Sequence, residues 1–423
     1  MSSSKKGFVN FIQEFSIPLI VGVFAALAAA NLNPEGYREF IEWDWFTQGK
    51  PDAEAFKIFG YRVTLAWFIN DIFMVFFFGI AAKEIAEATL PGGSLNPMKK
   101  AINPLFATIG GVVGPVGTFF IGLWLLESSS LIPAGYQASD LRAGWGIPTA
   151  TDIALAWLVA RAVFGVGHPA INFLLLLAVA DDAIGLGIIA IFYGDPAHPA
   201  EPVYLLLVLL GMAIAFIFRR ADVKSWLPYI FVAGPFSWTG LMLAHLHPAL
   251  ALVAIVPFLP GPKRDTGMFK TEDEVSEVAG GREETEHDQH SPLHNFEHDL
   301  KLFVDLGLFF FAFTNAGVEF AGIGSLTWLI LASLVIGKTV GVALFAYIAV
   351  LLGFPLPDRM GKRELLMAGF IAALGLTVAL FVSSAAFTDL GLQGQAKMGA
   401  LFSGLVGLAA IVLGRILRIK SRS

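Results

Sequence analysis

Two adjacent carboxylates lie inside a run of aliphatic residues and glycine. The run is LLAVADDAIGLGII, residues 176–189, and Asp181 and Asp182 are its only polar side chains. Taking a carboxylate out of water is costly unless a proton, a cation or a partner charge neutralises it. Such a group can bind either a proton or a hard cation that prefers oxygen ligands, and the two ions compete for it. The pair is therefore a candidate ion and proton site.

Apart from the ends of the apolar segments, few other charges fall inside them. They are Asp71 in WFINDIF, Asp152 in GIPTATDIA, Asp305 in KLFVDLG and Lys338 in LVIGKTVG. A charge at such a position usually faces a cavity or a partner. Lys338 has no acidic residue three or four positions away, so its compensating charge must come from another helix. Asp71 is equally explained as a polar anchor between helices or as a residue on an ion pathway.

The composition indicates that these segments lie in a membrane. Of the 423 residues 56% are hydrophobic and only 15% are charged, and the mean hydropathy is +0.70. Soluble domains carry about 25% charged residues. We therefore predict an all-α, polytopic membrane protein. The absence of cysteine excludes disulfides, thiol catalysis and cysteine-based metal sites.

About twelve segments are apolar and long enough to cross a bilayer, which takes roughly 20 residues per helix. We place them near residues 13–31, 60–82, 101–127, 144–164, 169–193, 202–218, 226–242, 244–260, 300–322, 325–352, 364–388 and 395–416. The first of them has some features of a cleaved signal peptide, but the charge pattern is consistent only if it is retained.

Basic residues give the orientation, because they are enriched in cytoplasmic loops. They fall in every second connection: Lys5 and Lys6, Lys99 and Lys100, Arg161, Arg219 to Lys224, Lys263 and Arg264, Arg359 to Arg363, and Arg415 to Arg422. Both termini are therefore predicted to be cytoplasmic.

Two segments carry signals for a break inside a span. GWGIPTATDIA, residues 144–154, has glycine and proline directly before Thr151 and Asp152, and AALGLTVAL, residues 372–380, has glycine just before Thr377. Paired interrupted helices are the best sequence pointer to the central site of a transporter. Kinked helices that pack closely through small residues would give either pattern alone. Their coincidence with intramembrane acids favours an ion site.

A long connection at residues 262–299 is acidic over 271–299 and bears several histidines. Its composition is typical of a solvated cytoplasmic loop. A second interpretation is a pH-responsive surface, because histidines titrate near neutrality among carboxylates.

The ordered set of motifs resembles the NhaA-type bacterial sodium/proton antiporters over nearly the whole chain. The motifs are INDIFMVFF, GWGIPTATDIALA, DDAIG followed by IIAIFY, FAFTNAGV, VIGKTVG and the glycine–threonine break at 375–377. The resemblance implies electrogenic exchange of Na+, and of Li+, for H+. It also implies inverted repeats whose two interrupted helices cross at the membrane midplane, an architecture for which this family is a known example.

The resemblance assigns roles residue by residue. Asp182 becomes the principal ion and proton ligand, with Asp181 and Thr151 completing the sodium site. Lys338 becomes the partner of Asp181. Asp152, Thr377 and Asp71 support the site or line the pathway, and His247 and Glu297 take part in the pH response. His247 is as well explained as a polar residue at a helix end. The chain departs from the family pattern in GIAAKEIAEA, where Glu84 and Glu87 lie near the positions of family acids.

The same resemblance implies one integral-membrane domain, residues 1–423. Residues 101–193 and 325–418 would form the ion-transport core, and 13–82 and 202–322 would supply interface helices. It implies a homodimer in the bacterial inner membrane, no cofactor beyond the transported ions, no nucleic-acid partner and no enzymatic activity.

Three other functions remain as alternatives. A cation-coupled symporter would use a similar site, and a channel would show unitary conductance. An intramembrane aspartyl protease needs two facing acids that share a proton, whereas neighbours on a regular helix point about 100° apart.

Overall fold

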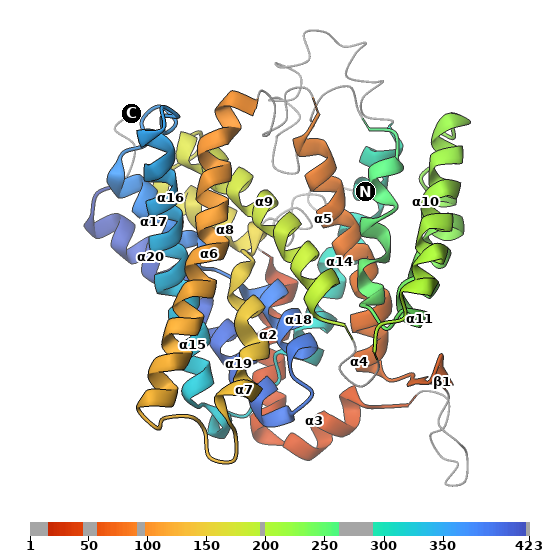
Figure 1. Ribbon diagram of the computed structural model, residues 1–423, viewed down its shortest axis with the longest axis horizontal. Helices are drawn as coiled ribbons and strands as arrows, with labels where there is room; N and C mark the ends of the chain where they lie inside the picture. Colours follow the sequence, from red (N-terminus) through yellow and green to blue (C-terminus); the bar gives the residue numbers. More distant parts are fainter. Residues whose placement is uncertain (1–15, 45–56, 91–97, 195–198, 262–290, 420–423) are drawn as a thin grey trace, which may run out of the picture. The chain divides into compact units, whose positions relative to one another are not determined.

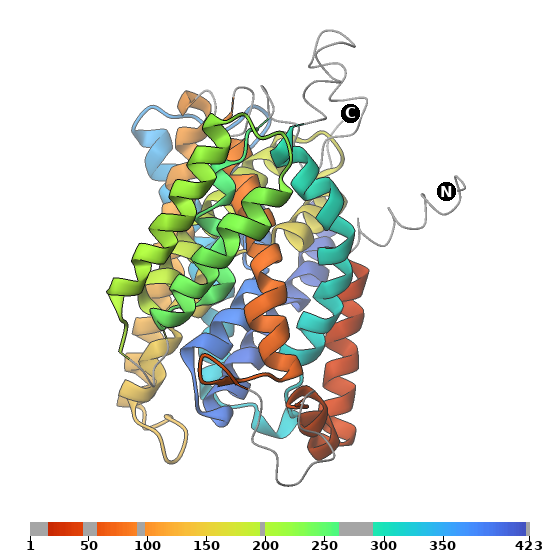
Figure 2. The same cartoon turned by 90° about the vertical axis from the view of Figure 1, so that its right-hand side faces the viewer.

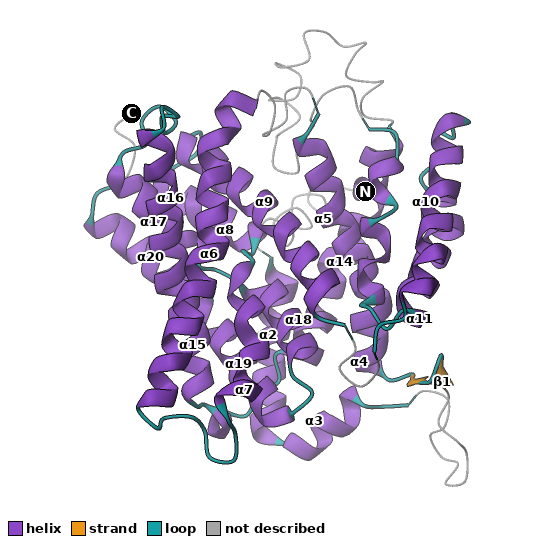
Figure 3. Ribbon diagram, viewed as in Figure 1, coloured by secondary structure: helices purple, strands orange, loops and turns teal. Residues whose placement is uncertain are grey.

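The computed structural model describes residues 16–44, 57–90, 98–194, 199–261 and 291–419. Helices dominate these ranges, as predicted for an all-α membrane protein (Figure 3). Within them the only paired strands are β1 (Lys57–Ile58) and β2 (Tyr61–Arg62), which form a short antiparallel hairpin. The hairpin overlaps the start of the second predicted span, 60–82, and the first helix after it begins at Leu65.

The chain divides into two compact units. Unit 1 consists of residues from 1–34, 98–189 and 315–423, and unit 2 of residues from 35–97 and 190–314. The elements of unit 1 are α2 (Ile17–Leu32), α6 (Met98–Ser128), α7 (Ala138–Leu141), η2 (Arg142–Thr149), α8 (Ile153–Phe164), α9 (Pro169–Phe192), η7 (Phe320–Gly322), α15 (Ser325–Ala332), η8 (Ser333–Lys338), α16 (Thr339–Leu351), α17 (Lys362–Ala372), α18 (Leu376–Ala386), α19 (Leu390–Ser403) and α20 (Leu405–Ile416) (Figure 1).

Unit 2 holds the hairpin and the other helices. They are α3 (Pro34–Ile41), α4 (Leu65–Trp67), η1 (Phe68–Phe73), α5 (Met74–Ala88), η3 (Pro202–Tyr204), α10 (Leu205–Arg220), η4 (Tyr229–Ala233), α11 (Gly234–Leu243), η5 (Pro248–Val253), η6 (Val256–Phe258) and α14 (Pro292–Asn315). Elements η1, η4 and η8 are π-helical turns, and the other η elements are 3-10 turns.

Among the described residues, six helices are long and apolar enough to cross a membrane, and eight if each of two bent pairs counts as one span. The bent pairs are 138–149 with 153–164 and 362–372 with 376–386, with bends of 54° and 45°. They fall where the sequence predicted interrupted helices, which confirms that prediction. Three shorter apolar helices and α14 occupy the other predicted spans.

The predicted span at 244–260 is wrong in its local structure. The chain there forms 3-10 turns, η5 and η6, rather than a continuous α-helix. Pro248 and Pro257 lie in the first positions of these turns. Proline cannot donate the backbone hydrogen bond that an α-helix needs there, so the apolar run alone was misleading.

Unit 1 contains two stretches with the same order of elements. Each has a long helix, a bent pair and a second long stretch of helix: α6, η2 with α8, and α9 in the first, and α15 to α16, α17 with α18, and α19 with α20 in the second. Helices α6 and α16 pack closely at glycines. A Cβ on Gly110 would collide with the backbone of Gly341, so neither position tolerates a side chain.

The first span, α2, also belongs to unit 1. The amide of Asn31 donates to the carbonyl oxygen of Val318 at 2.9 Å, and Phe320 N donates back to Asn31 Oδ1 at 2.9 Å. The predicted division instead grouped residues 13–82 as interface helices. Which helices meet a second subunit stays a prediction.

In unit 2, α5 and α14 lie side by side (Figure 2). The ring of Phe303 on α14 meets the rings of Phe73 and Phe76 edge-on, with centroids 5.6 and 5.7 Å apart. Helix α10 packs with α11 but leaves Leu206, Leu209 and other large apolar side chains exposed. Such a surface is expected of a helix that faces lipid.

The acidic connection predicted as a loop to residue 299 ends earlier. Residues 262–290 lie outside the described part of the chain, whereas α14 already begins at Pro292. The hydroxyl of Ser291 accepts the amide of His294 at 3.3 Å, and Leu293 and Phe296 are buried. These apolar residues give the first turns of α14 a buried face, which the acidic composition concealed.

Candidate functional site

The breaks of the two bent pairs meet at Asp152. Its backbone N donates to the carbonyl oxygen of Leu374 at 2.6 Å, which joins the two breaks. Its Oδ1 accepts the amide of Leu155 at 3.1 Å and so caps α8. Its Oδ2 accepts the hydroxyl of Thr377 at 3.0 Å and the amide of Thr377 at 3.4 Å. One carboxylate therefore satisfies the amino ends of both α8 and α18, where helix dipoles favour negative charge.

Asp181 and Lys338 form a fully buried ion pair. Asp181 comes from the middle of α9, and Lys338 is the last residue of η8. The hydroxyl of Thr151 lies 2.6 Å from Lys338 Nζ and 2.7 Å from Asp181 Oδ2. It also lies 2.9 Å from the carbonyl oxygen of Ala372, at the carboxyl end of α17. Because Thr151 has one hydrogen, it donates to only one of these two oxygens at a time.

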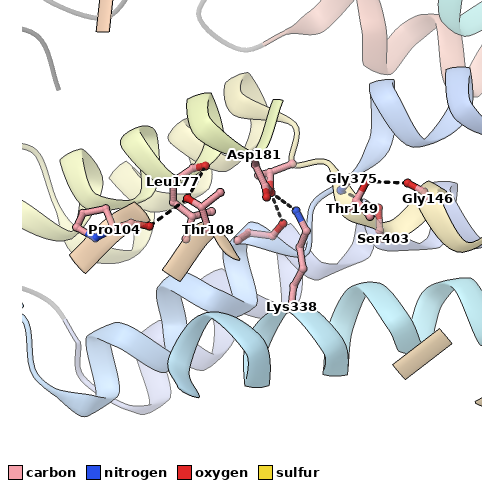
Figure 4. A network of polar contacts seen from close by, with 11 residues as sticks. Pro104, Thr108, Gly146, Thr149, Leu177, Asp181, Lys338, Gly375 and Ser403 are labelled. Carbon is pink, nitrogen blue, oxygen red and sulfur yellow. Dashed lines mark hydrogen bonds and ion pairs between the residues drawn. The ribbon is translucent and has the colours of Figure 1, made fainter. Parts of the chain in front are cut away.

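Figure 4 shows Lys338 reaching toward Asp181 from the opposite side of this cluster. The helix that carries Asp181 is held to α6 near its middle, because the Thr108 hydroxyl lies 3.4 Å from the carbonyl oxygen of Leu177. At the second break, Gly375 N donates to the Ser403 hydroxyl at 3.3 Å. Helices from both halves of unit 1 therefore position the ion pair.

Asp182 is half-buried next to this pair. The charges that act on it are those of Asp181, Asp152 and Lys338. Its Oδ1 and the Oδ1 of Asp181 are buried without a hydrogen-bond partner among the described residues. A buried carboxylate oxygen without a partner is rare, and it marks a position where a proton or a cation can bind.

The other three predicted site residues belong to unit 2. Asp71 lies half-buried in the π-helical turn η1, and its carbonyl oxygen accepts Trp238 Nε1 at 2.8 Å. His247 is half-buried at the residue before η5. Glu297 is buried near the start of α14.

Glu297 belongs to a cluster of three acids around one lysine. Lys83 on α5 is fully buried and pairs with Glu297, with Glu87 at 2.8 Å and with Glu84 at 3.1 Å. Lys301 approaches Glu297 from the next turn of α14 at 3.8 Å. Lys83 was not among the predicted site residues, although its spacing of four residues to Glu87 is that of a helical ion pair.

The cluster in unit 1 brings together oxygen ligands suited to a cation and one buried positive charge. Asp181, Asp182 and the Thr151 hydroxyl offer oxygen ligands, and Lys338 offers a positive charge that a second cation would displace. The described residues hold no group of three or more His, Asp or Glu side chains arranged as a metal site. A hard cation bound here would therefore also use hydroxyl or carbonyl oxygens, or water.

Comparison with known proteins identifies the family. Residues 7–417 match the sequence profile described as Na+/H+ antiporter 1. A protein of Desulfitobacterium hafniense (strain DSM 10664 / DCB-2) named Na(+)/H(+) antiporter NhaA is 54% identical over 419 residues, which covers 99% of this chain and 98% of the relative. A protein of the same name from Geobacter sulfurreducens is 52% identical over 413 residues, 97% of this chain and 98% of the relative. A third, from Jannaschia sp., is 41% identical over 437 residues, 98% of each. The chain therefore belongs to the Na+/H+ antiporter 1 family of multi-pass membrane proteins.

Proposed function

We propose that the protein exports Na+, and also Li+, in electrogenic exchange for H+ across the bacterial inner membrane. Its family membership supports sodium/proton antiport. The alternation of basic and non-basic connections supports cytoplasmic termini. By resemblance, the protein would act as a homodimer and contribute to pH and sodium homeostasis, without a cofactor and without catalysing a chemical reaction.

The observation that carries the proposal is the pair of buried Oδ1 atoms on Asp181 and Asp182 beside Lys338, which have no hydrogen-bond partner within the described ranges. In the proton-loaded state, Asp182 carries a proton and Lys338 is an ammonium paired with Asp181. A sodium ion that binds Asp182 displaces its proton and attracts the carboxylate of Asp181. Asp181 then leaves Lys338, which loses its counter-ion and releases a second proton.

Such a cycle moves two protons against one sodium ion, and one net charge crosses the membrane per turnover. Residues 101–193 and 325–418 would supply the moving core, and residues 13–82 and 202–322 the interface helices. Asp152 and Thr377 would hold the helix ends in place during this movement. Asp71 would line the path, and His247 and the Glu297 cluster would respond to pH.

The experiment is sodium-driven proton flux in proteoliposomes loaded with a pH-sensitive dye. We expect Asp182→Asn to abolish the flux while the protein remains folded, because asparagine keeps the shape of the side chain but cannot carry the exchanged proton. Asp305→Asn, the same change at a half-buried aspartate of α14 in unit 2, is the matched control. Flux at the wild-type rate in reconstituted Asp182→Asn would contradict the proposal.

A further inference from the structure

The helix that carries Asp181 and Asp182 begins at a histidine. Residues 165–168 connect α8 to α9, and Gly165 and Gly167 adopt left-handed φ values of 88° and 78°. His168 follows as the capping residue, and Pro169 is the first residue of α9. The amide of Ala170 donates to His168 Nδ1 at 3.1 Å. The imidazole therefore does what an aspartate or serine side chain does at most helix starts.

The imidazole is buried rather than exposed to solvent. Only 8% of His168 is exposed, and its ring stacks on Phe164 with centroids 5.4 Å apart and an interplanar angle of 17°. Two charged groups act on it: Glu364 in the first turn of α17, and Arg359 in the connection that precedes this helix. On α8, the nearest basic side chain in sequence is Arg161, whose guanidinium lies over the Trp157 ring at 4.4 Å.

The hydrogen bond at Nδ1 exists in only one protonation state. Nδ1 can accept the amide of Ala170 only when the ring is neutral and its proton is on Nε2. A second proton would go to Nδ1 and place two donors face to face. It would also put a positive charge at the amino end of α9, where the helix dipole opposes it.

The surroundings also favour the neutral ring. Burial lowers the pKa of His168, and Arg359 lowers it further, while Glu364 opposes both. A histidine whose pKa is lowered on folding stabilises the folded state above its unfolded value of about 6.5, and this contribution is lost as the pH falls below that value. The hydrogen bond that caps α9 is thus present at neutral and alkaline pH and is lost when acid protonates the ring.

We propose that His168 is a positioning residue for the ion site, because its imidazole caps α9 only while the ring is neutral. By the basic-residue pattern this turn faces the cytoplasm, so the cytoplasmic pH would set the state of the cap. The aspartates lie about 20 Å further along the same helix, at 1.5 Å per residue. A fall in pH loosens the first turn of α9 and so disfavours the arrangement in which α9 presents Asp181 and Asp182. The inference rests on the proposed antiport function.

The test uses two substitutions of the same residue in the full chain. His168→Asn keeps an acceptor oxygen for Ala170 N at every pH and does not titrate. His168→Ala removes both the acceptor and the titration. We expect His168→Asn to exchange ions at the wild-type rate at pH 8.5. Its acid midpoint, the pH at which acid has reduced the exchange rate to half, should be lower than that of wild type by about half a unit or more. We expect His168→Ala to be slower at pH 8.5, and His245→Asn, the same change in unit 2, to match wild type.

A second measurement does not depend on transport. Hydrogen–deuterium exchange of a peptide that covers residues 168–173, corrected for the intrinsic pH effect, should be faster at pH 5.5 than at pH 8 in wild type. It should be independent of pH in His168→Asn.

The outcomes separate this inference from the proposed function. If wild type and His168→Asn both exchange ions with the same acid midpoint, or if protection of α9 is the same in both at pH 5.5, the role of His168 is refuted and antiport stands. If wild type itself exchanges no protons for sodium at pH 8.5, the proposed function fails, and the deuterium exchange still decides whether His168 caps α9.

Discussion

Lys338→Ala should destabilise the protein strongly, because it removes the only cation paired with Asp181 in the described part of the chain. Both side chains are fully buried, and within that part the remaining partner of the Asp181 carboxylate is the Thr151 hydroxyl. Removing one member of a buried ion pair leaves an uncompensated charge, which typically costs about 3–5 kcal/mol.

The hydroxyl is already in place in the wild type, so it does not reduce the difference between the two proteins. We therefore expect Lys338→Ala to lose about 3–5 kcal/mol of unfolding free energy at neutral pH. A proton taken up by Asp181 would remove the uncompensated charge, so the deficit should shrink as the pH is lowered. A cavity left by the lysine side chain would give a deficit that does not depend on pH.

The double variant Asp181→Asn/Lys338→Ala separates the two causes. It keeps the cavity but has no buried charge in the pair, so its deficit should be smaller than that of Lys338→Ala and should not vary with pH. The measurement is equilibrium unfolding in mixed micelles at several pH values, for wild type, both single variants and the double variant. A Lys338→Ala deficit below about 1 kcal/mol, or one equal to that of the double variant, would refute the reasoning.

Asp152→Asn should weaken the apparent cation affinity in the flux assay without abolishing transport, because it removes a negative charge that acts on Asp182 and leaves one acceptor oxygen for two helix ends. Unchanged affinity at every pH would reduce Asp152 to a structural role. Flux in vesicles clamped with potassium and valinomycin should depend on membrane potential in wild type, because one charge moving through 100 mV changes the energy by about 2.3 kcal/mol. A flux that does not depend on membrane potential would exclude the exchange of two protons for one sodium ion. The amide of Leu392 and the hydroxyl of Tyr136 lower the pKa of Asp389 at the start of α19. Protection of this turn against deuterium exchange should therefore be present above about pH 4 and be lost below it, and Tyr136→Phe should raise the midpoint of this loss.

The sequence predicts the elements whose chemistry is local. The breaks at 150–152 and 373–375 follow from proline and glycine beside threonine and aspartate, and they occur where expected. The ends of α9 also agree with the apolar run at 169–193 to within a residue. The pairing of Asp181 with Lys338 required the family resemblance, because nothing in the spacing of two residues so far apart in the chain says that their helices touch.

Other features had no local signal or a misleading one. Asp71 and Lys338 both lie in π-helical turns, η1 and η8. A π-helical turn shifts the following residues around the helix, and it is often found at functional sites. The apolar periodicity of these segments is too uniform to reveal it. The true start of α14 was hidden by its acidic composition, because the buried Glu297 pairs with a lysine on α5 that is distant in sequence.

The contacts at the two breaks form a balanced set of charges. The amino ends of α8 and α18 converge on the negative Asp152. The carboxyl end of α17 reaches the positive Lys338 through Thr151, whose hydroxyl lies near both the Ala372 carbonyl and the ammonium. Helix ends and ions of opposite sign thus neutralise each other before any cation binds.

This balance determines what a sodium ion changes. Asp181 uses its Oδ2 for Lys338 and Thr151, while its Oδ1 and that of Asp182 remain unpartnered among the described residues. A cation bound between these two Oδ1 atoms breaks no existing hydrogen bond, but it adds a positive charge next to the ammonium of Lys338. In the proposed cycle both carboxylates hold the sodium ion, so Asp181 no longer compensates the ammonium of Lys338, which then favours release of its proton. Lys338 can lose its positive charge only by losing a proton, whereas the charge of sodium is removed only when the ion leaves the site. In the proposed cycle, the contacts that keep Lys338 buried would therefore make binding of sodium and retention of protons mutually exclusive.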